Sequence, residues 1–290
     1  MTKRAIALFL ATLVLATWGL QSFGLKMNGG DPQADGMAPY LIGSMFMPTL
    51  WSVVYLLFFN RRAFAAVAWK PGRLSGWLVA ALLPAGIAFT ALAVFLNFNL
   101  ATSGYFSFGA DGATIASGPW VLGLGEQGWA RFVANIAATA IAFSALNALA
   151  AVGEEFGWRG LLQPHMIREY GLVKGVALLG FVWAIWHLPA NLAGYNYPEF
   201  PLLGAFVIFP VTLIAASFVL AALTIWSRSF WPAALFHGGI NSIFEGVRSK
   251  TDATEGVSQL QLELVFTGVE VALAVFCLAL LLIFYRAPRA

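Results

Sequence analysis

Eight apolar stretches divide the chain, most of them close to the length that a helix needs to cross a lipid bilayer. About 20 helical residues span the ~30 Å of hydrocarbon. Because the backbone finds no water there, only helices and closed barrels can cross. Within each stretch the apolar residues are continuous rather than alternating, which favours helices. The expected spans are residues 5–23, 40–59, 76–99, 130–163, 173–192, 202–226, 230–246 and 264–285.

The composition excludes an ordinary soluble domain. The chain is 60% hydrophobic and only 10% charged, more apolar surface than a water-soluble fold can bury. We therefore expect an all-α, polytopic membrane protein. The predicted organisation is a single membrane domain over residues 1–290, with a catalytic core at about 130–246 and flanking helices in 1–99 and 264–285.

Basic residues predict the orientation of the spans. Stretch 5–23 follows Lys3 and Arg4 but has no clean cleavage site, so it is interpreted as the first span rather than a signal peptide. With that end inside the cell and eight spans, both termini are cytoplasmic. Of the 16 Lys and Arg residues, the outside would hold only Lys26, Arg131, Arg248 and Lys250. The inside would hold Lys3, Arg4, Arg61, Arg62, Lys70, Arg73, Arg159, Arg168, Lys174, Arg228, Arg286 and Arg289. Basic residues spread singly in this way do not indicate a nucleic-acid partner.

Glu154, Glu155 and Arg159 lie within the apolar stretch 130–163. A charge at bilayer depth is costly and usually marks a functional cavity. Residues four apart share a helix face, so Glu155 can pair with Arg159. Glu154 is rotated by roughly 100° from Glu155 and is expected to point elsewhere, where it can act as a base. The alternative interpretation is that Glu154, Glu155 and Arg159 lie in water at a cytoplasmic helix end.

Two further polar pairs occupy other apolar stretches. Trp183 and His187 are four apart and precede Pro189, which is expected to break the helix. His237 and Asn241 are also four apart, with two glycines between them that leave room for close approach to the backbone. Taken singly, each pair has an alternative interpretation, as a hydrogen-bonded packing residue or an interhelical polar contact.

The depths of these groups are similar. Counting from the cytoplasmic end of each span at ~1.5 Å per residue, Glu154 lies ~13 Å deep, His187 ~16 Å, His237 ~10 Å and Asn241 ~16 Å. We therefore expect the three pairs to form one site in the cytoplasmic half of the bilayer.

The chemistry of such a site fits peptide hydrolysis. A carboxylate with a histidine can activate water, and a histidine N–H with an asparagine amide can stabilise an oxyanion. The chain has no Gly-x-Ser-x-Gly or His-Glu-x-x-His motif, Cys277 is remote from the polar pairs, and Ser242 has no base at a neighbouring position.

Together the three motifs resemble those of a known family. They are Gly-Glu-Glu-x-x-x-Arg-Gly over 153–160, an aromatic-x-x-x-His ending at His187, and His237-x-x-x-Asn241. They are similar to the motifs of the CPBP intramembrane proteases, the CAAX-processing and bacteriocin-processing (ABI, type II CAAX endopeptidase) group of glutamic endopeptidases. The family commonly has phenylalanine where this chain has Trp183.

The resemblance implies a helical membrane enzyme with an aqueous chamber open to the cytoplasm. By position, Glu154 would be the catalytic base acting with His187 on water. His237 and Asn241 would form the oxyanion site, with Glu155, Arg159 and Trp183 in support. No cofactor is implied. The implied partners are the lipid bilayer and a membrane-associated peptide or protein substrate, and the implied location is the bacterial plasma membrane.

Two alternatives use the same residues. Glu154, Glu155, His187 and His237 could ligate zinc in a metalloprotease, although Asn241 is an unusual ligand and Arg159 would oppose a cation. A non-enzymatic transporter or immunity scaffold could use the same cavity, and Glu245 and Glu270 keep a proton-coupled role open, although both are expected near helix ends or in local pairs.

The glycine-rich stretch 101–128 is interpreted as a loosely ordered connector. The sequence leaves the oligomeric state and the substrate open.

Overall fold

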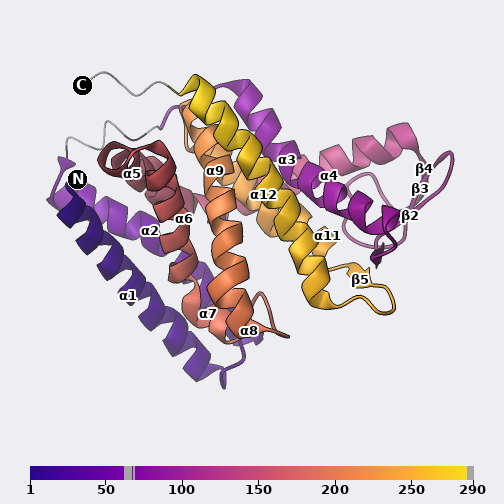
Figure 1. The fold of residues 1–290 in the computed structure, drawn as a ribbon, viewed down its shortest axis with the longest axis horizontal. Helices are drawn as coiled ribbons and strands as arrows, with labels where there is room; N and C mark the ends of the chain where they lie inside the picture. Colours follow the sequence, from indigo (N-terminus) through magenta and orange to yellow (C-terminus); the bar gives the residue numbers. More distant parts are fainter. Residues whose placement is uncertain (62–66, 68, 286–290) are drawn as a thin grey trace. The chain divides into compact units, whose positions relative to one another are not determined.

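The computed structural model describes residues 1–61, 67 and 69–285, and most of them are helical (Figure 1). Arg62, Arg286 and Arg289, which the sequence analysis placed in the cytoplasm, lie outside the described residues.

Within the described residues, six helical segments are long and apolar enough to cross a membrane. Helices of this length and apolarity indicate an integral membrane protein. The count of eight spans and the cytoplasmic location of both termini stay predictions. The six segments are Lys3–Met27, Asp35–Phe58, Leu74–Asn97, Trp129–Tyr170, Pro201–Ser227 and Gln259–Phe284.

The other two predicted spans are helical but shorter. Stretch 173–192 is split into α6 (Leu172–Trp186) and α7 (Leu188–Leu192). His187 caps α6, and Pro189 stands in the first turn of α7, so the predicted break is confirmed. Stretch 230–246 consists of α10 (Trp231–Gly239), the π-helix η5 (Ile240–Phe244) and α11 (Glu245–Arg248).

The chain forms two compact units. Unit 1 comprises Met1–Arg73, Ala150–Ala233 and Glu270–Ala290, and unit 2 comprises Leu74–Leu149 and Ala234–Val269. The expectation of a single membrane domain with a catalytic core at 130–246 stays a prediction.

In unit 1, α6 lies between α1 (Lys3–Met27) and α9 (Phe209–Ser227) (Figure 1). Two indole hydrogen bonds fix α1 to α6. The Trp18 Nε1–H donates to the Ile185 carbonyl at 2.8 Å, and the Trp186 Nε1–H donates to Thr17 Oγ1 at 2.8 Å. Such hydrogen bonds satisfy polar groups that have no hydrogen-bond partner in lipid. They also set the register between the two helices.

Glycines bring the first motif against α2 (Ala38–Phe58). Gly153 and Gly157 are four apart, and a Cβ on them would come within 2.8 Å of the Met45 carbonyl oxygen and 2.6 Å of Pro48 respectively. Small residues at this spacing let two membrane helices approach closely. The backbone that carries Glu154 and Glu155 is therefore held directly against a neighbouring helix. The rest of unit 1 comprises the short elements η1 (Asp35–Met37), α5 (Gln163–Tyr170), α8 (Pro201–Leu203) and the π-helix η4 (Gly204–Ile208).

Unit 2 contains β-structure that the sequence analysis missed. β2 (Phe106–Phe108), β3 (Gly112–Ile115) and β4 (Gly125–Gly128) form an antiparallel sheet with β3 in the centre. β1 (Ala101–Ser103) pairs antiparallel with β5 (Thr251–Ala253). The interpretation of residues 101–128 as a loosely ordered connector was wrong.

Aromatic packing explains why this stretch is ordered. Phe106 on β2 lies 4.9 Å from the Trp120 ring and 5.6 Å from the Phe132 ring, between ring centroids. Phe89 of α3 (Leu74–Asn97) joins the cluster, 5.2 Å from Phe106. Such aromatic clusters combine a large buried area with favourable ring geometry. Unit 2 is completed by the first part of α4 (Trp129–Glu155) and the start of α12 (Gln259–Phe284).

Candidate active site

The first motif lies where an α-helix becomes a π-helix. Glu154 and Glu155 are the last residues of α4, and the π-helix η3 (Phe156–Leu162) follows at once. All three charged groups are buried, with 2% of Glu154, 0% of Glu155 and 1% of Arg159 exposed. The alternative of a solvated helix end is therefore wrong. Single π-helical turns within α-helices are frequent at functional sites.

Arg159 pairs with Glu155, as predicted. Its Nη1 lies 3.0 Å from Glu155 Oε1. Its Nη2 donates to Ser217 Oγ on α9 at 3.1 Å. The guanidinium carbon lies 4.3 Å from the centroid of the Trp183 ring, within the range of a cation–π contact. Arg159 is thus fixed from two helices besides its own. Sequence reasoning missed Ser217, whose only signal was a hydroxyl in an apolar span.

Glu154 is held by an indole. The Trp183 Nε1–H donates to Glu154 Oε2 at 2.7 Å. The interpretation that Glu154 points away from the Glu155–Arg159 pair fits this contact, because its partner is on α6. The sequence analysis gave Trp183 a supporting role and treated its exchange for phenylalanine as a change between aromatic residues. In the structure, its nitrogen provides a hydrogen bond that phenylalanine lacks.

His187 is oriented by the backbone of the same tryptophan. Its Nδ1 lies 2.9 Å from the Trp183 carbonyl oxygen. A carbonyl oxygen can only accept, so Nδ1 carries the hydrogen, and in the neutral ring the lone pair is on Nε2. The ring of His187 packs edge-on against Trp186 at 4.5 Å and Phe209 at 5.1 Å, between centroids. These contacts fix both the tautomer and the orientation of the ring.

The third motif belongs to unit 2. His237 is buried near the end of α10, whereas Asn241 is exposed and lies in the π-helix η5. A Cβ on Gly238 would come within 2.5 Å of the Ala148 nitrogen on α4. One on Gly239 would come within 2.5 Å of Pro84 on α3. The close approach predicted at these glycines is therefore made by neighbouring helices. Ser242 donates to the Gly238 carbonyl of its own helix at 2.6 Å.

The structure thus brings five predicted residues together within unit 1: Glu154, Glu155, Arg159, Trp183 and His187. The other two, His237 and Asn241, lie in unit 2. That the two groups form one site stays a prediction.

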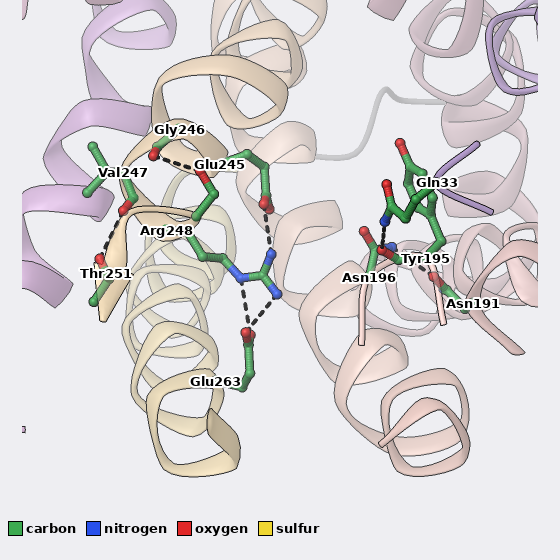
Figure 2. A network of polar contacts seen from close by, with 11 residues as sticks. Gln33, Asn191, Tyr195, Asn196, Glu245, Gly246, Val247, Arg248, Thr251 and Glu263 are labelled. Carbon is green, nitrogen blue, oxygen red and sulfur yellow. Dashed lines mark hydrogen bonds and ion pairs between the residues drawn. The ribbon is translucent and has the colours of Figure 1, made fainter. Parts of the chain in front are cut away.

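Asn191 is a polar residue that the sequence analysis missed. It stands four residues after His187, the same spacing as His237 and Asn241, and only 1% of it is exposed. Its Oδ1 accepts from Asn196 Nδ2 at 2.8 Å (Figure 2). Its Nδ2 has no hydrogen-bond partner among the residues that the structure describes. The repeated His-x-x-x-Asn spacing was the signal that could have drawn attention to it.

In the described part of the chain, no three His, Cys, Asp or Glu side chains form a group that could hold a metal ion. A zinc site would also require His237, which belongs to unit 2.

Comparison with known proteins finds a family of endopeptidases to which part of this chain is similar. Residues 136–243 match the family model described as type II CAAX prenyl endopeptidase, Rce1-like. This range contains all three motifs, so the resemblance inferred from them is confirmed. A 49-residue stretch is 39% identical to "CAAX prenyl protease 2" of Methanococcus maripaludis. That stretch covers 17% of this chain and 18% of the archaeal protein.

Proposed function

We propose that this chain is a membrane-embedded endopeptidase that hydrolyses peptide bonds of membrane-associated peptides or proteins. The observation that carries this proposal is the buried Glu154 carboxylate, hydrogen-bonded by Trp183 beside the Glu155–Arg159 pair. A buried carboxylate of this kind is costly to retain, and it lies within the segment that matches the endopeptidase family.

In the proposed reaction, Glu154 takes a proton from a water molecule while the water oxygen attacks the peptide carbonyl carbon. The resulting tetrahedral intermediate collapses when the C–N bond breaks and the leaving nitrogen receives the proton that Glu154 took from the water. His187 assists through Nε2, which can accept a hydrogen from the water in the neutral ring, or donate one when protonated. The contact of Nδ1 with the Trp183 carbonyl oxygen supports this role, because it places the hydrogen of the neutral ring on Nδ1.

His237 and Asn241 are the proposed oxyanion donors. As the carbonyl oxygen becomes negative, an imidazole N–H and an amide N–H would stabilise it. Glu155 and Arg159 support the site by holding a compensated charge pair next to Glu154. We further propose that the site faces the cytoplasm of a bacterial plasma membrane and that no metal is required.

The substrate proposed is a peptide held at the membrane surface. The archaeal relative is named a prenyl protease, so lipidated peptides are one candidate. A fluorogenic peptide, offered with and without a prenyl group to purified protein in detergent, separates lipid-dependent from lipid-independent cleavage.

The decisive variant is Glu154→Gln, which keeps the shape and polarity of the side chain but cannot accept a proton. We expect turnover to fall by about 10²–10⁴ with unchanged thermal stability. The matched control is Glu245→Gln, which alters a half-buried glutamate in unit 2 and should leave turnover unchanged. Cleavage by Glu154→Gln at the wild-type rate would exclude Glu154 as the base.

A second variant separates the proposal from a zinc enzyme. Asn241→Ala should lower kcat by about 10²–10³ with little change in KM, because the oxyanion exists only at the transition state. Wild-type activity should survive a chelator. Activity that is lost with chelator and restored by zinc, together with a fully active Asn241→Ala, would instead establish a metalloprotease.

A further inference from the structure

Trp183 contacts three of the four other predicted residues of unit 1, each through a different part of its structure. Its indole nitrogen lies 2.7 Å from Glu154 Oε2. Its ring face lies 4.3 Å from the Arg159 guanidinium. Its backbone oxygen lies 2.9 Å from His187 Nδ1. One residue therefore links the carboxylate, the guanidinium and the imidazole.

The indole nitrogen is the part that another aromatic residue lacks. Phenylalanine can pack on a guanidinium, and its backbone carbonyl can accept from a histidine, but its ring has no N–H. Glu154 is 2% exposed, and a buried carboxylate requires hydrogen-bond donors within the protein. At 2.7 Å the indole bond is at the short end of the range for N–H···O contacts.

The bond also limits where the carboxylate can point. A glutamate side chain has three rotatable torsions, and α4 and α6 are separate helices. The Trp183 indole N–H, which is fixed on α6, restricts Glu154 to the orientations in which its Oε2 can accept that hydrogen bond. The Trp183 ring is itself fixed, because it is 4% exposed and packs on Arg159.

We propose that Trp183 is a positioning residue, whose indole N–H holds the Glu154 carboxylate in the orientation needed for proton transfer. This inference rests on the proposed role of Glu154 as the base. Positioning of a reacting group can contribute strongly to rate without altering substrate binding.

The kinetic test is Trp183→Phe. We expect kcat to fall about 10- to 100-fold, or ~1.4–2.7 kcal/mol at 1.36 kcal/mol per tenfold, with KM unchanged. The matched control is Trp18→Phe, which also removes an indole hydrogen bond, at 2.8 Å to the Ile185 carbonyl on α6. Trp18→Phe should keep the wild-type kcat. A Trp183→Phe enzyme with the wild-type kcat, or an equal loss in both variants, would overturn the proposal.

A spectroscopic test addresses the contact without requiring activity. In protein labelled with ¹⁵N at the indole nitrogens, the Trp183 signal is identified by its loss in Trp183→Phe, or in Trp183→Tyr if the first variant does not fold. In Glu154→Gln the acceptor becomes a neutral amide, a weaker partner than a carboxylate. The Trp183 indole proton should therefore shift toward lower frequency, whereas Glu245→Gln should leave it in place.

The two tests separate the possible failures. A Trp183 signal that does not respond to Glu154→Gln would overturn the positioning role, whatever the kinetics. A wild-type protein that cleaves no peptide while the Trp183 signal does respond would contradict the proposed function and leave the Trp183–Glu154 contact established.

Discussion

Each unit contains a cluster of two glutamates and one arginine, and the two clusters are built differently. In unit 2, Arg248 binds both carboxylates, with Nη1 2.8 Å from Glu245 and Nη2 2.7 Å from Glu263 (Figure 2). In unit 1, Arg159 binds Glu155, and the second carboxylate, Glu154, accepts from a neutral indole. Burial differs as well: the side chains of Arg159 and Glu155 are both fully buried, whereas Arg248 is 17% and Glu245 42% exposed.

The comparison shows how the same residue types can serve structure or chemistry. A guanidinium shared by two carboxylates forms charge-assisted hydrogen bonds to both and crosslinks α11 to α12. In unit 1 a neutral indole donates to the second carboxylate, Glu154. This arrangement fits the proposed role of Glu154 in proton transfer, whereas the unit 2 cluster fits a structural role. The expectation that Glu245 pairs locally is confirmed by its contact with Arg248, three residues away.

The largest effect is expected from Arg159→Ala. Removing one member of a fully buried pair leaves an uncompensated charge and typically costs ~3–5 kcal/mol. The melting temperature in detergent should fall sharply, and cleavage should fall with it, because Glu155 would repel Glu154. An inactive Arg159→Ala protein with the wild-type melting temperature would instead assign Arg159 a direct role in the reaction.

Arg248→Ala is expected to have a smaller effect on stability and none on chemistry. Glu263 is 6% exposed and would lose its charged partner, but Arg248 itself reaches solvent. We expect a cost of about 1–3 kcal/mol, below that of a fully buried pair. Turnover per folded molecule should match wild type in the fluorogenic peptide assay. A loss of turnover as large as that of Arg159→Ala would contradict the purely structural role of the unit 2 cluster.

The smallest effect is expected from Glu245→Ala. This carboxylate is 42% exposed and forms an i,i+3 pair, the kind of ion pair that contributes about 0.2–1 kcal/mol. Its contribution should also weaken as ionic strength rises. The melting temperatures of wild type and Glu245→Ala should differ slightly at low salt and become equal at high salt. A salt-independent difference above about 1 kcal/mol would show that Glu245 belongs to the buried network.

The features predicted correctly from the sequence are those set by local spacing. Glu155 and Arg159 are four apart, and the structure joins them at 3.0 Å. Pro189 ends the helix that carries His187, because proline lacks the N–H that a continuing helix needs. The apolar stretches form helices because lipid-facing backbone must satisfy itself.

The features missed depend on residues far apart in the chain. The strands over 101–115 are only three or four residues long, with Gly104 and Gly109 between them, and β1 is paired with β5, which lies beyond residue 250. No local pattern predicts the β1–β5 pairing, because the partner strand lies about 150 residues away. The aromatic cluster around Phe106 of β2 likewise draws on residues from other elements.

The sequence by itself determined that the chain is a helical membrane protein and which residues make up its predicted polar pairs, because hydrophobic length and helical spacing are local properties. Only the tertiary structure decided which partner each polar group meets. Glu154 meets an indole 29 residues later, and Arg159 a hydroxyl 58 residues later. These contacts depend on where the end of α4 and the π-helix η3 meet α6 and α9, and on how α6 packs on α9, where Gly180 allows close approach to the Leu213 and Ile214 backbone. That register results from the packing of whole helices, which no short stretch of sequence specifies.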